Sequence, residues 1–271
     1  LPRAQRRRGR FRGDSMEIHP TAIVHPKARL PEQGRIGPYC VVEEDVELGE
    51  GTELDSHVVL YRGTRLGRDS RLHAGAVLGQ AAQVRGQTTA RSHVVVGDRA
   101  QLFPYATIER GHGEGEATRI GDDAFIMAHV HVGHNGTVGN QVTLGGGLAM
   151  AGYAVVEDNA FIGGGAVQHQ YSRVGRLAMV GGNVRINRDV PPFILAAEFD
   201  AAARGLNLVG LKRYGMSAEK ILALKHAYRL LYRSKLPLAE ALDRIEKEVA
   251  TEEARYLASF VRSSKRGICR E

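Results

Sequence analysis

The sequence predicts a mainly β chain, a parallel β-helix of hexapeptide repeats followed by a small α-helical domain. From Ile18 to Ile186 every sixth residue is apolar, apart from Glu114 and Gln168. Small residues recur four places after the apolar position, and glycine is frequent directly after it. The repeat stops at the double proline Pro191–Pro192, and apolar residues at helical spacing follow. A period of six fits neither an α-helix nor a simple alternating strand.

The repeat also predicts how each coil is built. Each hexapeptide forms one short strand and one turn, with the aliphatic residue inward and glycine in turns that need a positive φ. Three hexapeptides, or 18 residues, close one triangular coil, so residues 18 apart stack in coils about 4.8 Å apart. We expect this β-helix to cover residues 16–191.

Three segments fall outside the regular pattern. Residues 1–15 are predicted to be a basic disordered arm with six Arg and one Asp. The arm carries +5 of the formal net charge of +7, which leaves +2 for the rest, so nucleic-acid binding is not expected. Residues 80–92 and 110–118 keep the phase of the repeat but lose its pattern, and they are predicted to be loops that leave the coil.

Residues 192–271 are predicted to form the helical domain. A helix is expected over residues 218–233, with Ser217 as a candidate N-cap. Its apolar face comprises Ile221, Leu224, Ala227, Tyr228 and Leu231. Two further helices are expected over about residues 237–249 and 252–261.

Composition limits the class of protein. Cys40 and Cys269 are far apart and form neither a disulfide framework nor a zinc motif, which favours the reducing cytoplasm. No run of about 20 apolar residues is present, so no transmembrane helix is expected. Residues 124–156 contain no Asp, Glu, Lys or Arg. Because a solenoid can pack flat uncharged faces against a copy, we expect a homotrimer with sites between subunits.

One column of polar residues is the candidate site. Val132, Met150 and Gln168 are 18 residues apart and are predicted to stack, with His131 expected at the turn before Val132. The polar residues at and after these positions are His131, His134, Asn135, Gly152, Tyr153, His169, Gln170 and Tyr171. Such residues can bind hydrogen-bonding substrates and transfer protons. A zinc site is not predicted, because no third His has a matching position beside His131 and His134.

Several segments give the sequence a specific resemblance. They are IHPTAIVHPKA from Ile18, HVHVGHNGTVGN at 129–140, GGGAVQHQYSRVG at 163–175, DVPPF from Asp189 and GLNLVGLKRYG from Gly205. From Met16 to the C-terminus, the chain resembles the acyl-[acyl-carrier-protein]–UDP-N-acetylglucosamine O-acyltransferases of lipid A biosynthesis. The resemblance implies a left-handed β-helix and a homotrimer. It also implies acyl carrier protein and a UDP-amino sugar as partners, without a cofactor or metal.

The resemblance also implies a mechanism. A 3-hydroxyacyl chain moves from its carrier thioester to the 3-hydroxyl of UDP-N-acetylglucosamine. His134 takes the position of the general base, Asn135 that of the residue beside it, and Gly152 that of the backbone donor to the oxyanion. The positions that contact substrate are His131, His169, Gln170, Gly182, Asn207 and Arg213. Among these, Gly182 matches the position that limits acyl-chain length, and Asn207 and Arg213 match residues that hold the nucleotide sugar.

Departures from the family pattern leave two alternatives open. Asn135 stands where an Asp is usual, and the other departures are Val84, Tyr153, Val209 and Tyr214. Because an amide carries no charge to stabilise an imidazolium, the acceptor could be a 3-amino UDP-sugar or the substrate of a related N-acyltransfer. The second alternative is a trimer without catalysis that serves as a binding scaffold. Basic residues of the helical domain are expected to contact the acidic carrier: Lys212, Arg213, Lys220, Lys225, Arg229, Arg233 and Lys235.

Overall fold

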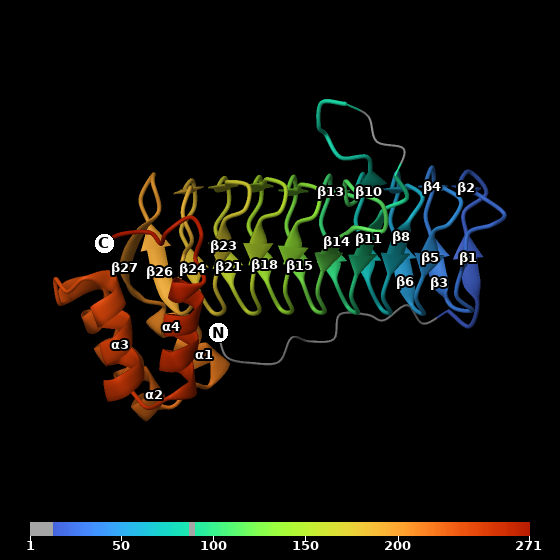
Figure 1. Ribbon diagram of the computed structural model, residues 1–271. Helices are drawn as coiled ribbons and strands as arrows, with labels where there is room; N and C mark the ends of the chain where they lie inside the picture. The colour runs from blue at the N-terminus through green and yellow to red at the C-terminus, as the bar shows by residue number, and fades with distance from the viewer. Residues whose placement is uncertain (1–12, 87–89) are drawn as a thin grey trace.

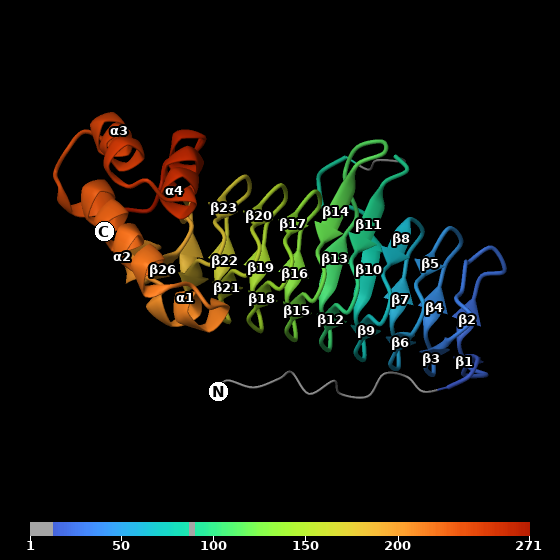
Figure 2. The same cartoon turned by 90° about the horizontal axis from the view of Figure 1, so that it is seen from below.

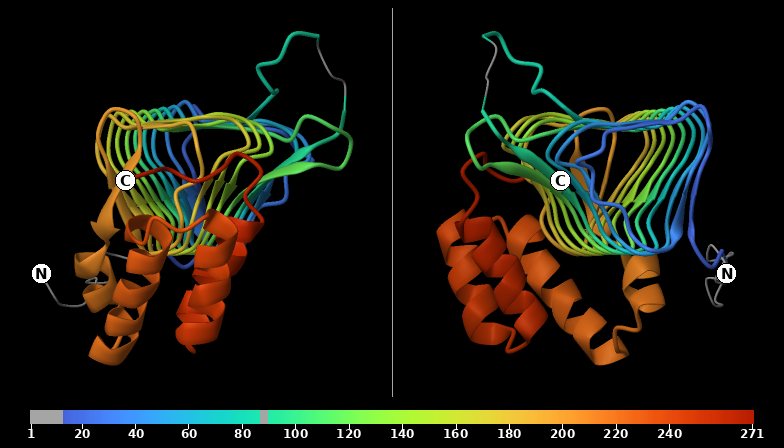
Figure 3. Two further views of the ribbon diagram at one scale, coloured as in Figure 1. Left: turned by 60° about the vertical axis from the view of Figure 1, so that its left-hand side comes forward. Right: turned by 90° about the vertical axis from the view of Figure 1, so that its right-hand side faces the viewer.

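The computed structural model describes residues 13–86 and 90–271. Most of the predicted basic arm, residues 1–12, therefore lies outside the described residues. The described chain forms a long three-sided coil with helices at its C-terminal end (Figure 1). Seen nearly along its axis, the coil stacks successive turns into three flat sides (Figure 3).

Each side of the coil is a sheet of short strands, and the described residues form three such sheets, parallel throughout except for the last strand of the first sheet. The first sheet contains β1 (Met16–Ile18), β3 (Gly34–Ile36), β6 (Thr52–Leu54), β9 (Arg71–Leu72), β12 (Gln101–Leu102), β15 (Phe125–Ile126), β18 (Thr143–Leu144), β21 (Phe161–Ile162), β24 (Met179–Val180), β26 (Ile194–Ala197) and β27 (Ala202–Leu206). The second contains β2 (Ile23–Val24), β4 (Val41–Val42), β7 (Val59–Leu60), β10 (Val77–Gln80), β13 (Thr107–Glu109), β16 (His131–Val132), β19 (Ala149–Met150), β22 (Val167–Gln168) and β25 (Arg185–Ile186). The third contains β5 (Glu47–Leu48), β8 (Thr64–Leu66), β11 (His93–Val96), β14 (Ala117–Ile120), β17 (Thr137–Val138), β20 (Val155–Val156) and β23 (Arg173–Val174).

The core follows the repeat. Ile36 pairs with Leu54, and Val132 with Met150, each 18 residues along the chain. The aliphatic side chains stack inside the coil and are almost fully buried. Gln168 is buried among them because its amide nitrogen donates to the carbonyls of Val155 and Ser172, at 3.2 and 3.1 Å. The predicted β-helix is confirmed.

The two irregular segments leave the coil as predicted. The described residues between β10 and β11, 81–86 and 90–92, project away from the coil (Figure 1), and a shorter excursion joins β13 to β14 (Figure 3). The coil resumes in register after each of them, because β11 pairs with β14 from His93↔Ala117 onward. Both excursions start at the corner between the second and third sheets.

The end of the coil differs in part from the expected helical domain. The double proline ends the hexapeptide repeat, yet β26 still pairs with β24 and forms an antiparallel hairpin with β27. A strand can follow there because both prolines precede the paired residues. The helices are α1 (Leu208–Tyr214), α2 (Ala218–Tyr228), the π-helix η1 (Arg229–Arg233), α3 (Leu238–Glu248) and α4 (Glu252–Arg262). The three predicted helices are confirmed, and they gather at the C-terminal end of the coil (Figure 2).

Asp189 attaches the C-terminal segment to the coil. Its buried carboxylate accepts the Arg173 backbone N–H at 2.8 Å and the Ser264 hydroxyl at 2.8 Å. The Asp189 carbonyl accepts from the backbone N–H of Cys269, and its N–H donates to Gly267. The Asp of the DVPPF segment is therefore a structural anchor.

Candidate active site

The predicted column lies at the corner where the second sheet turns into the third. The register Val132↔Met150↔Gln168 confirms the stacking expected from the 18-residue spacing. His134, Gly152 and Gln170 consequently occupy equivalent turn positions in three consecutive coils. We call this edge of the molecule the site corner.

His134 is held at the site corner from two directions. Its backbone N–H donates to a carboxylate oxygen of the buried Glu109, at 3.0 Å. Its ring Nδ1 lies 2.9 Å from Oδ1 of Asn135. The imidazole is therefore fixed in position by one neighbouring side chain and by its own backbone.

The hydrogen bonds of Asn135 determine the tautomer of His134. Oδ1 of Asn135 accepts the backbone N–H of His112 at 3.0 Å, and Nδ2 donates to Glu116 at 2.8 Å. An N–H only donates and a carboxylate only accepts, so the amide has one possible orientation. Nδ1 of His134 must then carry the proton that Oδ1 accepts. Nε2 keeps its lone pair, as a general base requires.

Gly152 lies directly against that lone pair. A Cβ added to Gly152 would stand 2.6 Å from Nε2 of His134, closer than real contacts allow. Within the described part of the chain, the Gly152 N–H donates no hydrogen bond, whereas the next N–H, of Tyr153, donates to the His134 carbonyl. An N–H available beside the base is suited to stabilise an oxyanion that forms there.

His131 joins the same cluster through Glu109. Its Nδ1 lies 2.9 Å from the Thr107 hydroxyl, and its Nε2 lies 3.7 Å from the Glu109 carboxylate. The prediction that His131 sits in the turn was wrong. It belongs to strand β16, and its side chain leaves the outer face of the second sheet. Glu109 was not predicted as a site residue; the loop that follows it breaks the hexapeptide pattern.

Aromatic rings extend the site corner toward the C-terminus. Tyr153 meets the His134 ring edge-on at 5.2 Å and stacks on Tyr171 at 5.0 Å. Burial raises the pKa of Tyr153, so its hydroxyl stays protonated at neutral pH. His169 and Gln170 are exposed on the coil beyond, and Nδ1 of His169 lies 3.0 Å from the Gln170 carbonyl.

Three predicted substrate residues do not lie at the site corner. Gly182 follows β24 of the first sheet, at another corner of the coil. Asn207 caps α1: its Oδ1 accepts from the Gly210 N–H at 3.0 Å, and its Nδ2 donates to the Leu177 carbonyl at 2.9 Å. Arg213 is exposed near the end of α1. Within one chain, the predicted site residues therefore lie on two separate surfaces.

The family departures also fall on both surfaces. Val209 and Tyr214 are exposed on α1, beside Arg213. Val84 lies in the excursion after β10, where its N–H donates to the Ala82 carbonyl. In the same excursion, the Gln83 N–H donates to Glu109 at 3.3 Å. The first loop therefore contacts the cluster around His131 through its backbone.

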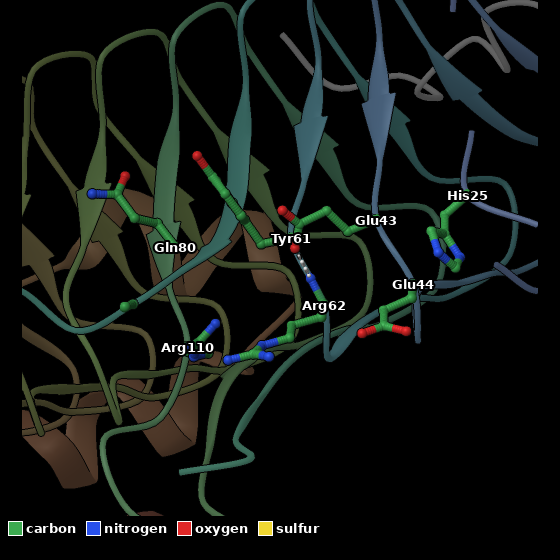
Figure 4. Close-up of a pocket in the computed structure, with 8 residues that line it drawn as sticks. His25, Glu43, Glu44, Tyr61, Arg62, Gln80 and Arg110 are labelled. Carbon is green, nitrogen blue, oxygen red and sulfur yellow. Dashed lines mark hydrogen bonds between the residues drawn. The ribbon is translucent and has the colours of Figure 1, made fainter. Parts of the chain in front are cut away.

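A hollow of about 770 Å³ continues the site corner toward the N-terminus (Figure 4). It is lined by His25, Glu43, Glu44, Tyr61, Arg62, Gln80, Ala81 and Arg110. Burial and the nearby Arg62 guanidinium lower the pKa of Arg110, while Glu43 opposes them. Nε of Arg110 has no hydrogen-bond partner among the described residues. The hollow begins one coil before His134.

No group of three or more His, Cys, Asp or Glu among residues 13–86 and 90–271 is arranged to hold a metal ion. The described helices include none long and apolar enough to cross a membrane.

Comparison with known proteins identifies the family. An acyl-[acyl-carrier-protein]–UDP-N-acetylglucosamine O-acyltransferase from Thermodesulfovibrio yellowstonii is 42% identical over 256 residues, which cover 94% of this chain and 99% of that protein. The chain belongs to this family. An Anaeromyxobacter dehalogenans member is 41% identical over 257 residues, covering 94% of this chain and 100% of that protein. Residues 189–269 match the family described as "Udp N-acetylglucosamine O-acyltransferase; Domain 2".

Solved structures of the family have the same fold. The Francisella novicida UDP-N-acetylglucosamine acyltransferase superposes with a TM-score of 0.90 at 32% identity, covering 94% of each chain. The Moraxella catarrhalis enzyme gives a TM-score of 0.88 at 35% identity, over 93% of this chain and 99% of that one. The coil therefore winds as it does in these relatives, and the left-handed parallel β-helix with C-terminal helices is confirmed.

Proposed function

We propose that this chain transfers an acyl group from acyl carrier protein to the 3-hydroxyl of UDP-N-acetylglucosamine, the first step of lipid A biosynthesis, with His134 as general base. The observation that carries the proposal is the close approach of Nε2 of His134 to Gly152, whose N–H no described residue accepts. An acyl transfer needs both groups, a base for the attacking oxygen and a donor for the oxyanion.

The reaction then proceeds in two steps. Nε2 of His134 removes the proton from the sugar 3-hydroxyl while that oxygen attacks the thioester carbonyl carbon. The negative charge that develops on the carbonyl oxygen is stabilised by the Gly152 N–H. The tetrahedral intermediate collapses and breaks the C–S bond. The departing thiolate of the carrier takes the proton from His134 and leaves as a thiol, which returns the imidazole to its starting state.

A hydroxyl acceptor is favoured over a 3-amino acceptor. An amine would be the better acceptor if no negative charge stood near His134 to stabilise its imidazolium, since the Asn135 side chain is itself neutral. Its amide donates to Glu116, however, so a carboxylate stands behind it. The Glu116 carboxylate therefore supplies negative charge behind His134, and the base does not need an acceptor more nucleophilic than a hydroxyl.

The working enzyme is proposed to be a homotrimer in the cytoplasm. Exposed apolar side chains on the coil and on α1 support a partner surface: Phe161, Val167, Tyr171, Leu208, Val209 and Tyr214. A neighbouring subunit would bring Gly182, Asn207 and Arg213 to the site corner, where His169 and Gln170 are exposed to the nucleotide sugar. Both cysteines are free and buried, which suits a reducing compartment.

The test measures product with both kinds of acceptor. Purified protein is incubated with 3-hydroxyacyl carrier thioesters and either UDP-N-acetylglucosamine or its 3-amino analogue at equal concentration, and products are measured by mass. The expected result is a product heavier than the hydroxyl sugar by one acyl group. Faster transfer to the amine would replace the hydroxyl proposal. No product with any donor or acceptor would favour the scaffold alternative.

A further inference from the structure

A second carboxylate lies behind the catalytic His134, separated from it by one amide. The Asn135 side chain bridges the two groups, with Oδ1 at 2.9 Å from Nδ1 of His134 and Nδ2 at 2.8 Å from Glu116. Glu116 comes from the excursion between β13 and β14, one residue before β14 begins. The two hydrogen bonds form one chain from carboxylate to imidazole.

The Glu116 carboxylate is itself fixed in place. The oxygen that accepts from Asn135 also accepts the Gly113 N–H at 2.7 Å, across a tight turn of the same excursion. These hydrogen bonds, first from Asn135 and then from Gly113, lower the pKa of Glu116, so it is ionised at neutral pH. The charge therefore sits on a side chain that two donors hold still.

The backbone of Asn135 also belongs to this arrangement. Its φ of 59° lies in the left-handed region, which asparagine tolerates better than most residues. Its N–H donates to the Thr118 hydroxyl at 2.8 Å. The position is thus built for a short polar side chain that faces two partners at once.

We propose that Glu116 is a positioning residue for His134 that acts through the Asn135 amide. Together with the His112 N–H, it fixes which end of the amide faces the imidazole and so holds the proton on Nδ1. It also places a negative charge behind the imidazolium that forms during the reaction. Asn135 and Glu116 together do what a single Asp beside the base would do. This inference rests on the proposed role of His134 as general base.

The pair can be exchanged while the hydrogen bond between positions 116 and 135 is kept. With Asn135→Asp and Glu116→Gln combined, the new carboxylate accepts from His134, from the His112 N–H and from the amide introduced at position 116. The amide nitrogen then takes the place of the oxygen that accepts the Gly113 N–H, so that one hydrogen bond is lost. With Asn135→Asp alone, two carboxylates meet at the 2.8 Å contact and repel each other. With Glu116→Gln alone, the acceptor remains but the charge is lost.

The experiment compares these three variants with wild type and with Glu114→Gln as a control. Glu114 lies in the same excursion, where it accepts the Arg91 N–H at 2.8 Å. We expect each single change to lower kcat about 10-fold with little change in KM, the low end for a residue that orients a reacting group. The double variant should return to within about threefold of wild type, and Glu114→Gln should be unchanged.

Full kcat in Glu116→Gln, or a double variant as slow as both single changes combined, would overturn the proposal. The pH profile of each variant is recorded as well. Besides Glu116, the polar and titratable groups in contact with His134 are Glu109, His112, Tyr153 and Asn135, and His131 lies beyond Glu109.

A measurement made without substrate tests the role of Glu116 separately from the proposed acyl transfer. The ¹⁵N spectrum of the imidazole should report the Nδ1–H tautomer in wild type and a mixture of tautomers in Glu116→Ala. An unchanged tautomer in Glu116→Ala would overturn the positioning role even if the enzyme is active. If wild type shows no turnover but its tautomer changes in Glu116→Ala, the proposed function is contradicted and the positioning role is still supported.

Discussion

Replacing Gly152 by alanine tests the contact between the base and the oxyanion donor. The new Cβ would lie 2.6 Å from Nε2 of His134, about 0.8 Å inside an ordinary van der Waals contact of 3.4 Å. The imidazole has to turn away or move by that amount, which breaks its alignment with Asn135. Displacement of a reacting group by about 1 Å costs on the order of 10² in rate. We therefore expect kcat to fall about 100-fold.

The fold should tolerate this change. The φ of Gly152 lies outside the left-handed region, so alanine adds no backbone strain. Gly146→Ala is the matched control, because it occupies an equivalent turn position and its Cβ would meet nothing nearer than the Ala128 carbonyl at 3.3 Å. Steady-state kcat with a carrier thioester and the melting temperature are measured for both. A Gly152→Ala enzyme with more than half the wild-type kcat would show that this contact does not control the alignment of the base.

Three other predictions concern the chain-length limit, the C-terminal anchor and the carrier. Gly182→Met should slow transfer of long 3-hydroxyacyl donors more than short ones, measured as relative kcat/KM; equal loss for all donors would make Gly182 only a turn residue. Asp189→Ala should destabilise the fold by about 3 kcal/mol, as loss of a buried charged partner does, and lower the melting temperature. Asp200→Ala, which removes an exposed ion pair, should change the melting temperature little, and equal shifts would contradict the anchor. Lys225→Glu with Arg229→Glu, two exposed positions one helical turn apart, should raise KM for the carrier thioester at low salt and less at high salt. An unchanged KM at both salt concentrations would exclude this helix face from carrier docking.

The period of six made most of the fold and part of the site predictable. Because residues 18 apart stack, the sequence alone placed His134, Gly152 and Gln170 on one edge of the coil, and the strand register confirms this. The hairpin β26–β27 was missed, because two short strands after a double proline carry no repeat.

Glu109 and Glu116 were missed for a different physical reason. Each of them lies where the chain leaves or rejoins the coil, so the 18-residue spacing does not place them beside His134. One signal was present in the sequence: Asn135 lacks the charge that a base is usually given, and Glu114 and Glu116 lie in the charged loop one coil earlier. The position of Asn207 was predicted from resemblance, and its capping of α1 could only be seen in the structure.

The turnover of His134→Ala tests the role of the general base most directly. Wild-type and variant proteins are compared under saturating 3-hydroxyacyl carrier thioester and UDP-N-acetylglucosamine, with product quantified by mass and folding checked by melting temperature. The proposed mechanism predicts a kcat lower by about 10²–10⁴, the usual contribution of a positioned general base, with a melting temperature close to that of wild type. A folded His134→Ala protein that turns over at nearly the wild-type rate would exclude His134 as the base.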